Sequence, residues 1–361
     1  MQIKIYVKRL NLLFLILLFL NCDQGIGGED IEDRYGGINT EIIDITNTDS
    51  YSLYVNTGGS NYNILGKKDN YEARVLLRYS IVDSLSSDFT ASLVIYLDSL
   101  TSPYSCSLFY VSQNWNEYEV NWQSANSIEK WGMGGGRSVD STAEYFITTF
   151  VLQPESTVID IPADKKDKML ETFGFLIVPK DSMDFIKLPS KDQENKPLLI
   201  IKDGDREDEI SPIADAYLVN FDSTDMMKIM DWDYLGAGFS FRTFVEIPFD
   251  TIRENYISVR LRGYYSESVG DIDTFLIRAF PVIERWHGKY TAVDEDINDY
   301  GYLYPGQDYF DINIKKIVNN IDSNYTGVIV RVNYEFENIF RIKIDSFKLR
   351  VFYDSLAEGR F

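Results

Sequence analysis

The amino-acid sequence predicts an all-β protein with two tandem antiparallel β-sandwich domains of jelly-roll-like form, after a signal peptide and a flexible tether. Three observations support this fold class. Tyrosine and phenylalanine are abundant, with 25 and 22 copies in 361 residues, and aromatic residues are enriched in strands. Short segments alternate apolar and polar residues and are separated by Gly, Asn, Ser and Asp, as in β-sandwiches. The second half of the chain then repeats the order of these segments.

The chain begins with basic residues, continues with an apolar run at residues 10–20, and reaches a cysteine at Cys22. This run is too short for a membrane-crossing helix, which needs about 20 residues. The pattern is typical of a lipoprotein signal, in which a peptidase cuts before a cysteine that carries lipid. We therefore predict a lipoprotein signal peptide at residues 1–21 and lipidation of Cys22, with an ordinary secretory signal as the alternative.

Residues 22–44 are predicted as a tether from the membrane, because glycines and acidic residues cluster there and favour flexibility. Without its signal peptide the chain has only one other cysteine, Cys106, so no disulfide within the chain is expected once Cys22 is acylated. The alternation around Cys106 favours a small buried core residue over a reactive thiol.

The net charge of the chain is -21, from 35 basic and 56 acidic side chains. Such a charge repels nucleic-acid phosphates, so nucleic acid is excluded as a partner. The same repulsion disfavours polyanionic polysaccharides, and among glycans the neutral ones are expected to bind better.

The first predicted domain spans residues 45–203 and is built from short alternating segments. The expected strands lie at residues 51–56, 73–81, 92–97, 107–112, 157–161, 173–178 and 198–202. The best candidate for a helix is a short piece at residues 163–171.

A second, divergent domain is predicted at residues 213–354, after a charged linker at 204–212 that ends in a proline. Residues 53–56 correspond to 217–220, and residues 73–81 correspond to 241–249. Further correspondences join 92–97 with 256–261, 107–115 with 275–286, 158–162 with 310–314, 173–178 with 326–331, and 196–202 with 347–353. The chain is therefore expected to be a tandem repeat.

The first unit carries the motif Trp115-Asn-Glu-Tyr-Glu-Val-Asn-Trp122, an arginine at Arg74 in the strand Arg-Val-Leu-Leu-Arg-Tyr, and the strand Ser-Leu-Val-Ile-Tyr-Leu at 92–97. In these segments it resembles the DNRLRE domain, a β-sandwich grouped with carbohydrate-binding modules of exported proteins. The resemblance assigns Arg74, Trp115, Glu117 and Trp122 to its structural signature. The second unit keeps Arg242 and Trp286 but has no second tryptophan at the motif's spacing. The resemblance implies glycan binding without catalysis.

Sugar-binding modules stack pyranose rings on exposed aromatic faces. In the first unit, Trp131 and Arg137 flank a glycine-rich segment that we expect to be flexible and exposed. In the second unit, Trp232 and Tyr234 are the parallel candidates in the loop before the Arg242 strand. For all of these aromatic residues the competing interpretation is packing on their own sandwich.

A metal site and catalysis are weaker hypotheses. Asp294, Asp296 and Asn298 offer oxygen ligands that resemble the start of a calcium loop, but the rest of the EF-hand pattern is missing, which favours a solvated acidic loop. His287 is the single histidine, and no Gly-x-Ser-x-Gly sequence accompanies it. No cofactor is expected, and a polysaccharide-degrading enzyme is disfavoured.

The sequence therefore predicts an exported lipoprotein, held at the outer membrane or cell surface by lipid on Cys22, that binds glycan or extracellular matrix through its sandwiches. The alternative is an envelope structural or adhesion protein that contacts other proteins and binds no sugar.

Overall fold

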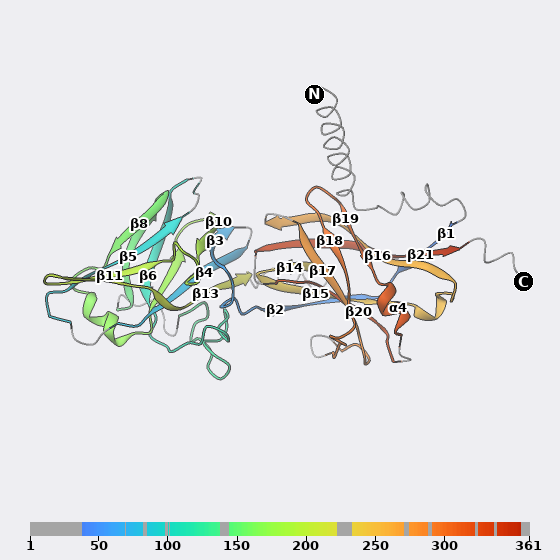
Figure 1. Cartoon of the computed structure of the whole chain (residues 1–361), viewed down its shortest axis with the longest axis horizontal. Helices are drawn as coiled ribbons and strands as arrows, with labels where there is room; N and C mark the ends of the chain where they lie inside the picture. The colour runs from blue at the N-terminus through green and yellow to red at the C-terminus, as the bar shows by residue number, and fades with distance from the viewer. Residues whose placement is uncertain are drawn as a thin grey trace, which may run out of the picture.

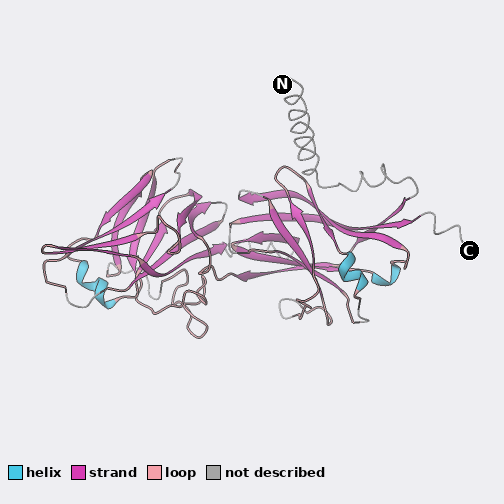
Figure 2. Cartoon of the chain, viewed as in Figure 1, coloured by secondary structure: helices cyan, strands magenta, loops and turns pink. Residues whose placement is uncertain are grey.

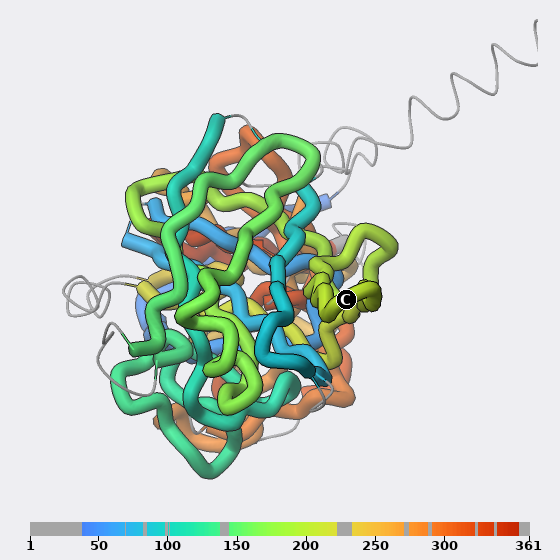
Figure 3. Tube along the Cα trace, turned by 90° about the vertical axis from the view of Figure 1, so that its left-hand side faces the viewer, coloured from blue at the N-terminus to red at the C-terminus, as the bar shows by residue number. Residues whose placement is uncertain are grey.

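The computed structural model describes residues 38–354, except 69, 82–84, 98–99, 101, 138–143, 222–232, 271–273, 288–290, 322–323 and 336–337. The described chain forms two β lobes that lie end to end along the long axis (Figure 1). Figure 2 shows that strands dominate both lobes and that the helical pieces are short. Seen along the long axis, one lobe lies behind the other (Figure 3). The predicted all-β fold is confirmed.

Lobe 1 is a sandwich of two antiparallel sheets. The larger sheet has the order β10-β3-β4-β9-β6-β7, and β13 also pairs with β4. Its strands are β3 (Tyr62–Lys68), β4 (Tyr71–Tyr79), β6 (Tyr104–Tyr110), β7 (Phe146–Leu152), β9 (Phe175–Pro179), β10 (Met183–Pro189) and β13 (Pro212–Phe221). The smaller sheet has the order β12-β11-β5-β8, with β5 (Thr90–Leu97), β8 (Glu155–Asp160), β11 (Leu198–Asp203) and β12 (Arg206–Ile210).

The core of lobe 1 consists of alternate side chains from both sheets, among them Leu65, Val75, Leu93 and Leu199, which are fully buried. Cys106 on β6 belongs to this core, and burial raises the pKa of its thiol to about 12. It is therefore a buried core residue, as expected. The predicted helical piece is present as the 3-10 helix η1 (Lys166–Glu171).

Lobe 2 contains one ten-stranded sheet with the order β1-β21-β14-β15-β20-β17-β18-β19-β16, to which β2 adds by pairing with β15. Its strands are β1 (Ile38–Ile45), β2 (Thr48–Tyr54), β14 (Asp233–Ala237), β15 (Phe239–Glu246), β16 (Tyr256–Gly270), β17 (Phe275–Pro281), β18 (Asp299–Leu303), β19 (Tyr309–Asn313), β20 (Gly327–Val332) and β21 (Phe340–Asp354). The long strands β16 and β21 also pair with each other, so the sheet folds back on itself around a second core. The helical pieces are η2 (Phe249–Thr251) and α4 (Lys315–Asn319).

The two lobes exchange the leading strands of the two sequence repeats. β2 belongs to the first repeat, yet it pairs with β15 in lobe 2, where Ser50 lies opposite Thr243. β13 leads the second repeat, yet it pairs with β4 in lobe 1, where Tyr217 lies opposite Val75. The preceding strands follow the same rule, since β1 pairs with β21 and β12 pairs with β11. Each lobe is therefore completed by strands of the other repeat.

This exchange corrects the predicted boundaries. Residues 38–44, predicted as part of the tether, belong to β1, and most of the predicted linker at 204–212 is β12 in a hairpin with β11. Lobe 1 is continuous from about residue 56 to Phe221, whereas lobe 2 combines residues 38–54 with residues 233–354. The sequence correspondences gave the strands in the right order, but they did not show which lobe the leading strands join.

An aromatic cluster joins the two lobes. Phe221 at the end of β13 lies 4.8 Å from the Tyr71 ring of lobe 1, and 6.4 and 6.2 Å from the Phe239 and Phe241 rings of lobe 2. Arg341 lies 4.7 Å from the centre of the Phe221 ring. These buried side chains belong to the same hydrophobic cluster as the lobe 1 core, so the lobes share part of their interior.

Among the described residues, no helix combines the length and the apolar character that a membrane crossing requires.

Candidate functional site

Arg74 on β4 holds the glycine-rich turn of lobe 1 in place. Its Nη1 donates a hydrogen bond to the Gly135 carbonyl oxygen at 2.9 Å, and its Nε donates to the Glu72 carboxylate at 2.7 Å. The guanidinium carbon lies 4.4 Å from the centre of the Trp122 ring, within the range of cation–π attraction. Burial lowers the pKa of Arg74, although an arginine stays charged in proteins. The signature arginine thus holds a loop and is only 5% exposed.

Trp115, at the start of the tryptophan motif, is also part of the interior of lobe 1. Its side chain is 2% exposed, and its Nε1 donates a hydrogen bond to the Phe173 carbonyl oxygen at 3.0 Å. Arg78 lies over its ring at 4.7 Å. The Trp115 ring is therefore not available for stacking with a sugar.

The expectation that Trp131 is exposed is wrong. Its side chain is 5% exposed and packs in the same hydrophobic cluster as Trp115, while its Nε1 donates to the Asn121 carbonyl oxygen at 2.9 Å. The glycine run is a tight turn here, because Gly135 has a φ of +59° and a Cβ there would lie 2.4 Å from Arg74 Nη1. Glycine allows the close approach of Gly135 to Arg74 and Trp122, and the Trp131 ring lies in the interior of lobe 1.

The other glycan candidates do not form a platform. Arg137 is half-buried, and its Nε is buried without a hydrogen-bond partner among the described residues. Tyr234 is predicted in a loop, but it lies on β14. It is 7% exposed and packs 5.7 Å from Phe241 in the shared aromatic cluster, which agrees with the competing interpretation of a packed ring. Trp232 lies outside the described residues.

In the second repeat, Arg242 on β15 forms two hydrogen bonds with Glu335, at 3.0 Å from Nε and 2.8 Å from Nη2. Trp286 stacks on Phe244 at 4.5 Å, and its Nε1 donates to the Asp49 carboxylate on β2 at 2.8 Å. Arg242 and Trp286 therefore both hold chain segments together, and Trp286 holds the exchanged strand β2.

The acidic loop at residues 294–298 uses its oxygens within the fold. Asp294 Oδ1 accepts hydrogen bonds from the backbone nitrogens of Asp296 and Ile297, and its Oδ2 accepts one from the Tyr325 hydroxyl at 3.0 Å. Asn298 accepts a hydrogen bond from Arg278. In the described part of the chain, no group of three His, Cys, Asp or Glu side chains is placed to hold a metal ion.

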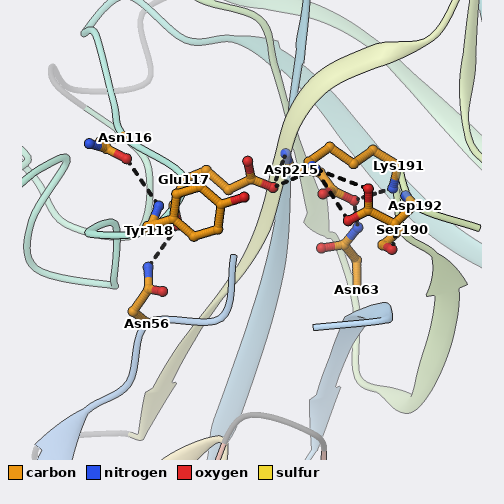
Figure 4. A network of polar contacts seen from close by, with 9 residues as sticks. All are labelled: Asn56, Asn63, Asn116, Glu117, Tyr118, Ser190, Lys191, Asp192 and Asp215. Atoms are coloured by element: carbon orange, nitrogen blue, oxygen red, sulfur yellow. Dashed lines mark hydrogen bonds and ion pairs between the residues drawn. The ribbon is translucent and has the colours of Figure 1, made fainter. Parts of the chain in front are cut away.

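Glu117 takes part in a buried polar network that ties the tryptophan motif to β13 (Figure 4). Its carboxylate is 3.6 Å from Lys191 Nζ and accepts a hydrogen bond from the Asp215 backbone nitrogen at 3.4 Å. The Asp215 carboxylate in turn accepts hydrogen bonds from Asn63 Nδ2 at 2.5 Å and from the Lys191 backbone nitrogen at 2.8 Å. Glu117 and Asp215 are 7% and 2% exposed, so a polysaccharide does not reach them in this conformation.

The burial of Asp215 in this network predicts that the stability of lobe 1 depends on pH. Burial raises the pKa of Asp215 above its ordinary value, so folding favours the protonated form and the associated stability is lost as pH rises through the raised pKa. Asp215→Asn removes this titration and keeps an acceptor oxygen for Asn63 and for the Lys191 backbone. Thermal melts at a series of pH values should test this. The Tm of Asp215→Asn should rise relative to that of the wild type as pH increases above about 4, the ordinary carboxyl pKa.

Asp184→Asn is the matched control of opposite sign. A hydrogen bond from Lys68 lowers the pKa of the exposed Asp184 carboxyl, so its contribution to stability is lost as pH falls. The Tm of Asp184→Asn should therefore fall relative to that of the wild type as pH rises. The change should be smaller than for Asp215→Asn because the site is exposed. A Tm difference for Asp215→Asn that stays constant with pH would contradict the buried-carboxylate interpretation.

A groove between the lobes is lined by exposed aromatic side chains, unlike the positions predicted from the sequence. Its volume is about 450 Å³, within the range of small-ligand sites. Three tyrosines line it: Tyr62 from lobe 1, and Tyr302 and Tyr334 from lobe 2. Their exposed fractions are 37%, 42% and 51%. Hydrogen-bonding groups are supplied by side chains around the tyrosines, namely Ser60, Asn61, Lys187, Thr274 and Asn338.

A row of tyrosines on the outer face of lobe 2 leads into this groove. Tyr300, Tyr302 and Tyr304 alternate along and just beyond β18, and all three are exposed. Neighbouring rings in the row are 6.1 and 5.9 Å apart. The sequence carries this signal as Tyr-Gly-Tyr-Leu-Tyr at 300–304, whose period of two places the rings on one face.

A larger cavity of about 800 Å³ lies beside the turn between β1 and β2. Its lining includes four isoleucines, three acidic residues and two aromatic residues, Phe249 and Tyr325, which are both half-buried. Among the described residues it has no row of exposed rings, so the groove at Tyr302 is the better candidate for a sugar.

No protein-family model matches this chain, and no curated protein matches it. The resemblance to the DNRLRE domain therefore stays a prediction from the motifs.

Proposed function

We propose that this chain is an exported, lipid-anchored protein that binds glycan without catalysis, and that its sugar site is the groove between the lobes. The observation that carries this proposal is the set of three exposed tyrosines, Tyr62, Tyr302 and Tyr334, in one concave surface. Aromatic faces attract the apolar C–H face of a pyranose ring. The amides of Asn61 and Asn338 supply donors and acceptors for sugar hydroxyls.

The proposed anchor joins lobe 2, not lobe 1. Cys22 lies outside the described residues, and 16 positions separate it from Ile38 at the start of β1. A chain of this length spans at most about 55 Å when fully extended. Because β1 belongs to lobe 2, this lobe is the one held near the membrane, and lobe 1 is reached only through it. The groove then lies between the proximal and distal lobes.

Binding is tested with the full chain in detergent, titrated with a panel of neutral oligosaccharides and followed by calorimetry. Tyr302→Ala and Tyr334→Ala should each weaken binding by about two- to tenfold, since a lost stacking contact costs about 0.5–1.5 kcal/mol. Tyr118→Ala is the control, because Tyr118 is a 68% exposed tyrosine on the tryptophan loop of lobe 1 and not in the groove. Circular dichroism checks that all three variants fold.

Two outcomes would contradict the proposal. If a sugar binds and neither groove variant weakens it, the site lies elsewhere. If no sugar of the panel binds, the glycan function fails as a whole.

A second candidate function is contact with another envelope protein, and one observation favours it. The tryptophan loop presents Tyr118, Ile128 and Met133 to solvent, with Ile128 91% exposed. The Asn126 side chain fixes this tip by accepting hydrogen bonds from the Ile128 and Glu129 backbone nitrogens. Exposed apolar side chains on a fixed loop are typical of protein-binding surfaces. Protein partners captured by the wild type and lost with Ile128→Ser would support this function.

A further inference from the structure

Lobe 2 is completed by a segment that is held less firmly than its counterpart in lobe 1. We call β1 and β2 together, residues 38–54, the donor segment. None of its residues is fully buried. By contrast, most residues of β13, which completes lobe 1, are buried. The donor segment is attached by backbone hydrogen bonds along its ladders with β15 and β21, and by side chains that are only partly buried, such as Ile43, Ile45 and Tyr54.

The surface that receives the donor segment cannot stay open. Almost all side chains of β15 are buried, including Phe239, Phe241 and Phe244. Without β2, one edge of this strand would carry unpaired backbone groups beside an apolar surface. Such an edge recruits another strand. The acceptor is specific for this segment, since Asp49 receives Trp286 Nε1 and Ser50 lies 2.8 Å from Thr243.

The partners of the donor segment are far away in the chain. Ser50 and Thr243, whose hydroxyl oxygens are in contact, are 193 residues apart in the sequence. The donor segment is thus made long before its own acceptor, and pairing over such a separation is slow. During this interval the acceptor of another copy competes for it.

The connection between the donor segment and lobe 1 is short. β2 ends at Tyr54, and Asn56 is already fixed in lobe 1 by hydrogen bonds from its Nδ2 to the Glu117 and Val120 carbonyl oxygens, both at 2.8 Å. Only Val55 lies between them. Short hinges of this kind favour the exchange of elements between copies.

From these four features we propose that copies of this chain exchange their donor segments. In the exchanged pair, β1 and β2 of one chain complete lobe 2 of the other. All ladder and side-chain contacts are the same as within one chain, so the two forms differ only at the hinge and in the entropy of association. The partner is therefore a second copy of this chain, and the interface is the one already present inside the molecule. This inference does not depend on the glycan proposal.

The test uses two full-length variants with different affinity tags, expressed in the same cells. One carries Ser50→Cys and the other carries Thr243→Cys. Because these positions face each other directly on β2 and β15, a disulfide between the chains forms only when β2 of the first lies against β15 of the second. Thr243 is fully buried, which excludes collision on the surface. We expect a band at twice the mass of one chain, with both tags, on a non-reducing gel.

Two controls make the result decisive. Ser92→Cys and Asp160→Cys face each other on β5 and β8 within lobe 1, and the corresponding pair of single variants should give no such band. The double variant Ser50→Cys/Thr243→Cys shows that the geometry permits the bond within one chain. If that bond forms and the mixed pair gives no more linked chains than the Ser92 and Asp160 pair, donor exchange is ruled out.

Discussion

Deletion of residues 38–54 is expected to unfold lobe 2. The deletion removes the ladders of β1 with β21 and of β2 with β15. At about 1 kcal/mol for each net hydrogen bond, the loss is on the order of 10 kcal/mol. This equals the whole stability of a typical domain, about 5–15 kcal/mol. Calorimetry of the deleted protein should show the melting transition of lobe 2 lost while that of lobe 1 remains.

The control is a deletion of residues 23–34, which stops short of β1 and should leave both lobes folded. The two deletions together compare the predicted tether with the segment that forms β1 and β2. If the protein without residues 38–54 melts like the wild type, the donor segment does not contribute to the stability of lobe 2.

Phe241→Ala is expected to destabilise both lobes. The side chain is fully buried, and its ring lies 5.3 Å from Phe239, 5.7 Å from Tyr234 and 6.2 Å from Phe221. Truncation of a buried phenylalanine costs about 3–5 kcal/mol. Because Phe221 comes from β13 of lobe 1, the cavity reaches across the junction. Hydrogen exchange should rise in β13 and β4 as well as in β15.

Phe310→Ala is the matched variant for this comparison. Phe310 is equally buried, but its cluster contains only residues of lobe 2. In the Phe310→Ala variant, hydrogen exchange should rise in lobe 2 and stay as in the wild type in β4 and β13. Equal protection of lobe 1 in the two variants would show that the aromatic cluster does not couple the lobes.

The sequence carried much of the fold but not its connectivity. Alternation along a strand shows which face is buried, and it located β4, β5 and β11 well. It does not show which strand lies alongside, because backbone hydrogen bonds are nearly the same for every pair of strands. The exchange of β2 and β13 could therefore not be predicted from residues 53–56 and 217–220, which are alike.

The site was harder to predict for a different reason. Trp131 was expected to be exposed because glycines follow it, but glycine allows both a flexible segment and a tight turn. The turn at Gly135 became evident only from its contact with Arg74. Tyr62, Tyr302 and Tyr334 come from three distant segments, and their meeting in one groove depends on how the lobes sit together. Only the alternation at 300–304 was visible in the sequence.

The exchange of leading strands also bears on how the two repeats change over evolutionary time. A duplication yields two copies in the sequence, yet each lobe here is a hybrid of both copies. A substitution in β2 alters the surroundings of Thr243 in the second copy, and one in β13 alters those of Val75 in the first. Neither copy can therefore be removed or transplanted alone without taking strands from the other lobe. The two repeats therefore form one structural unit.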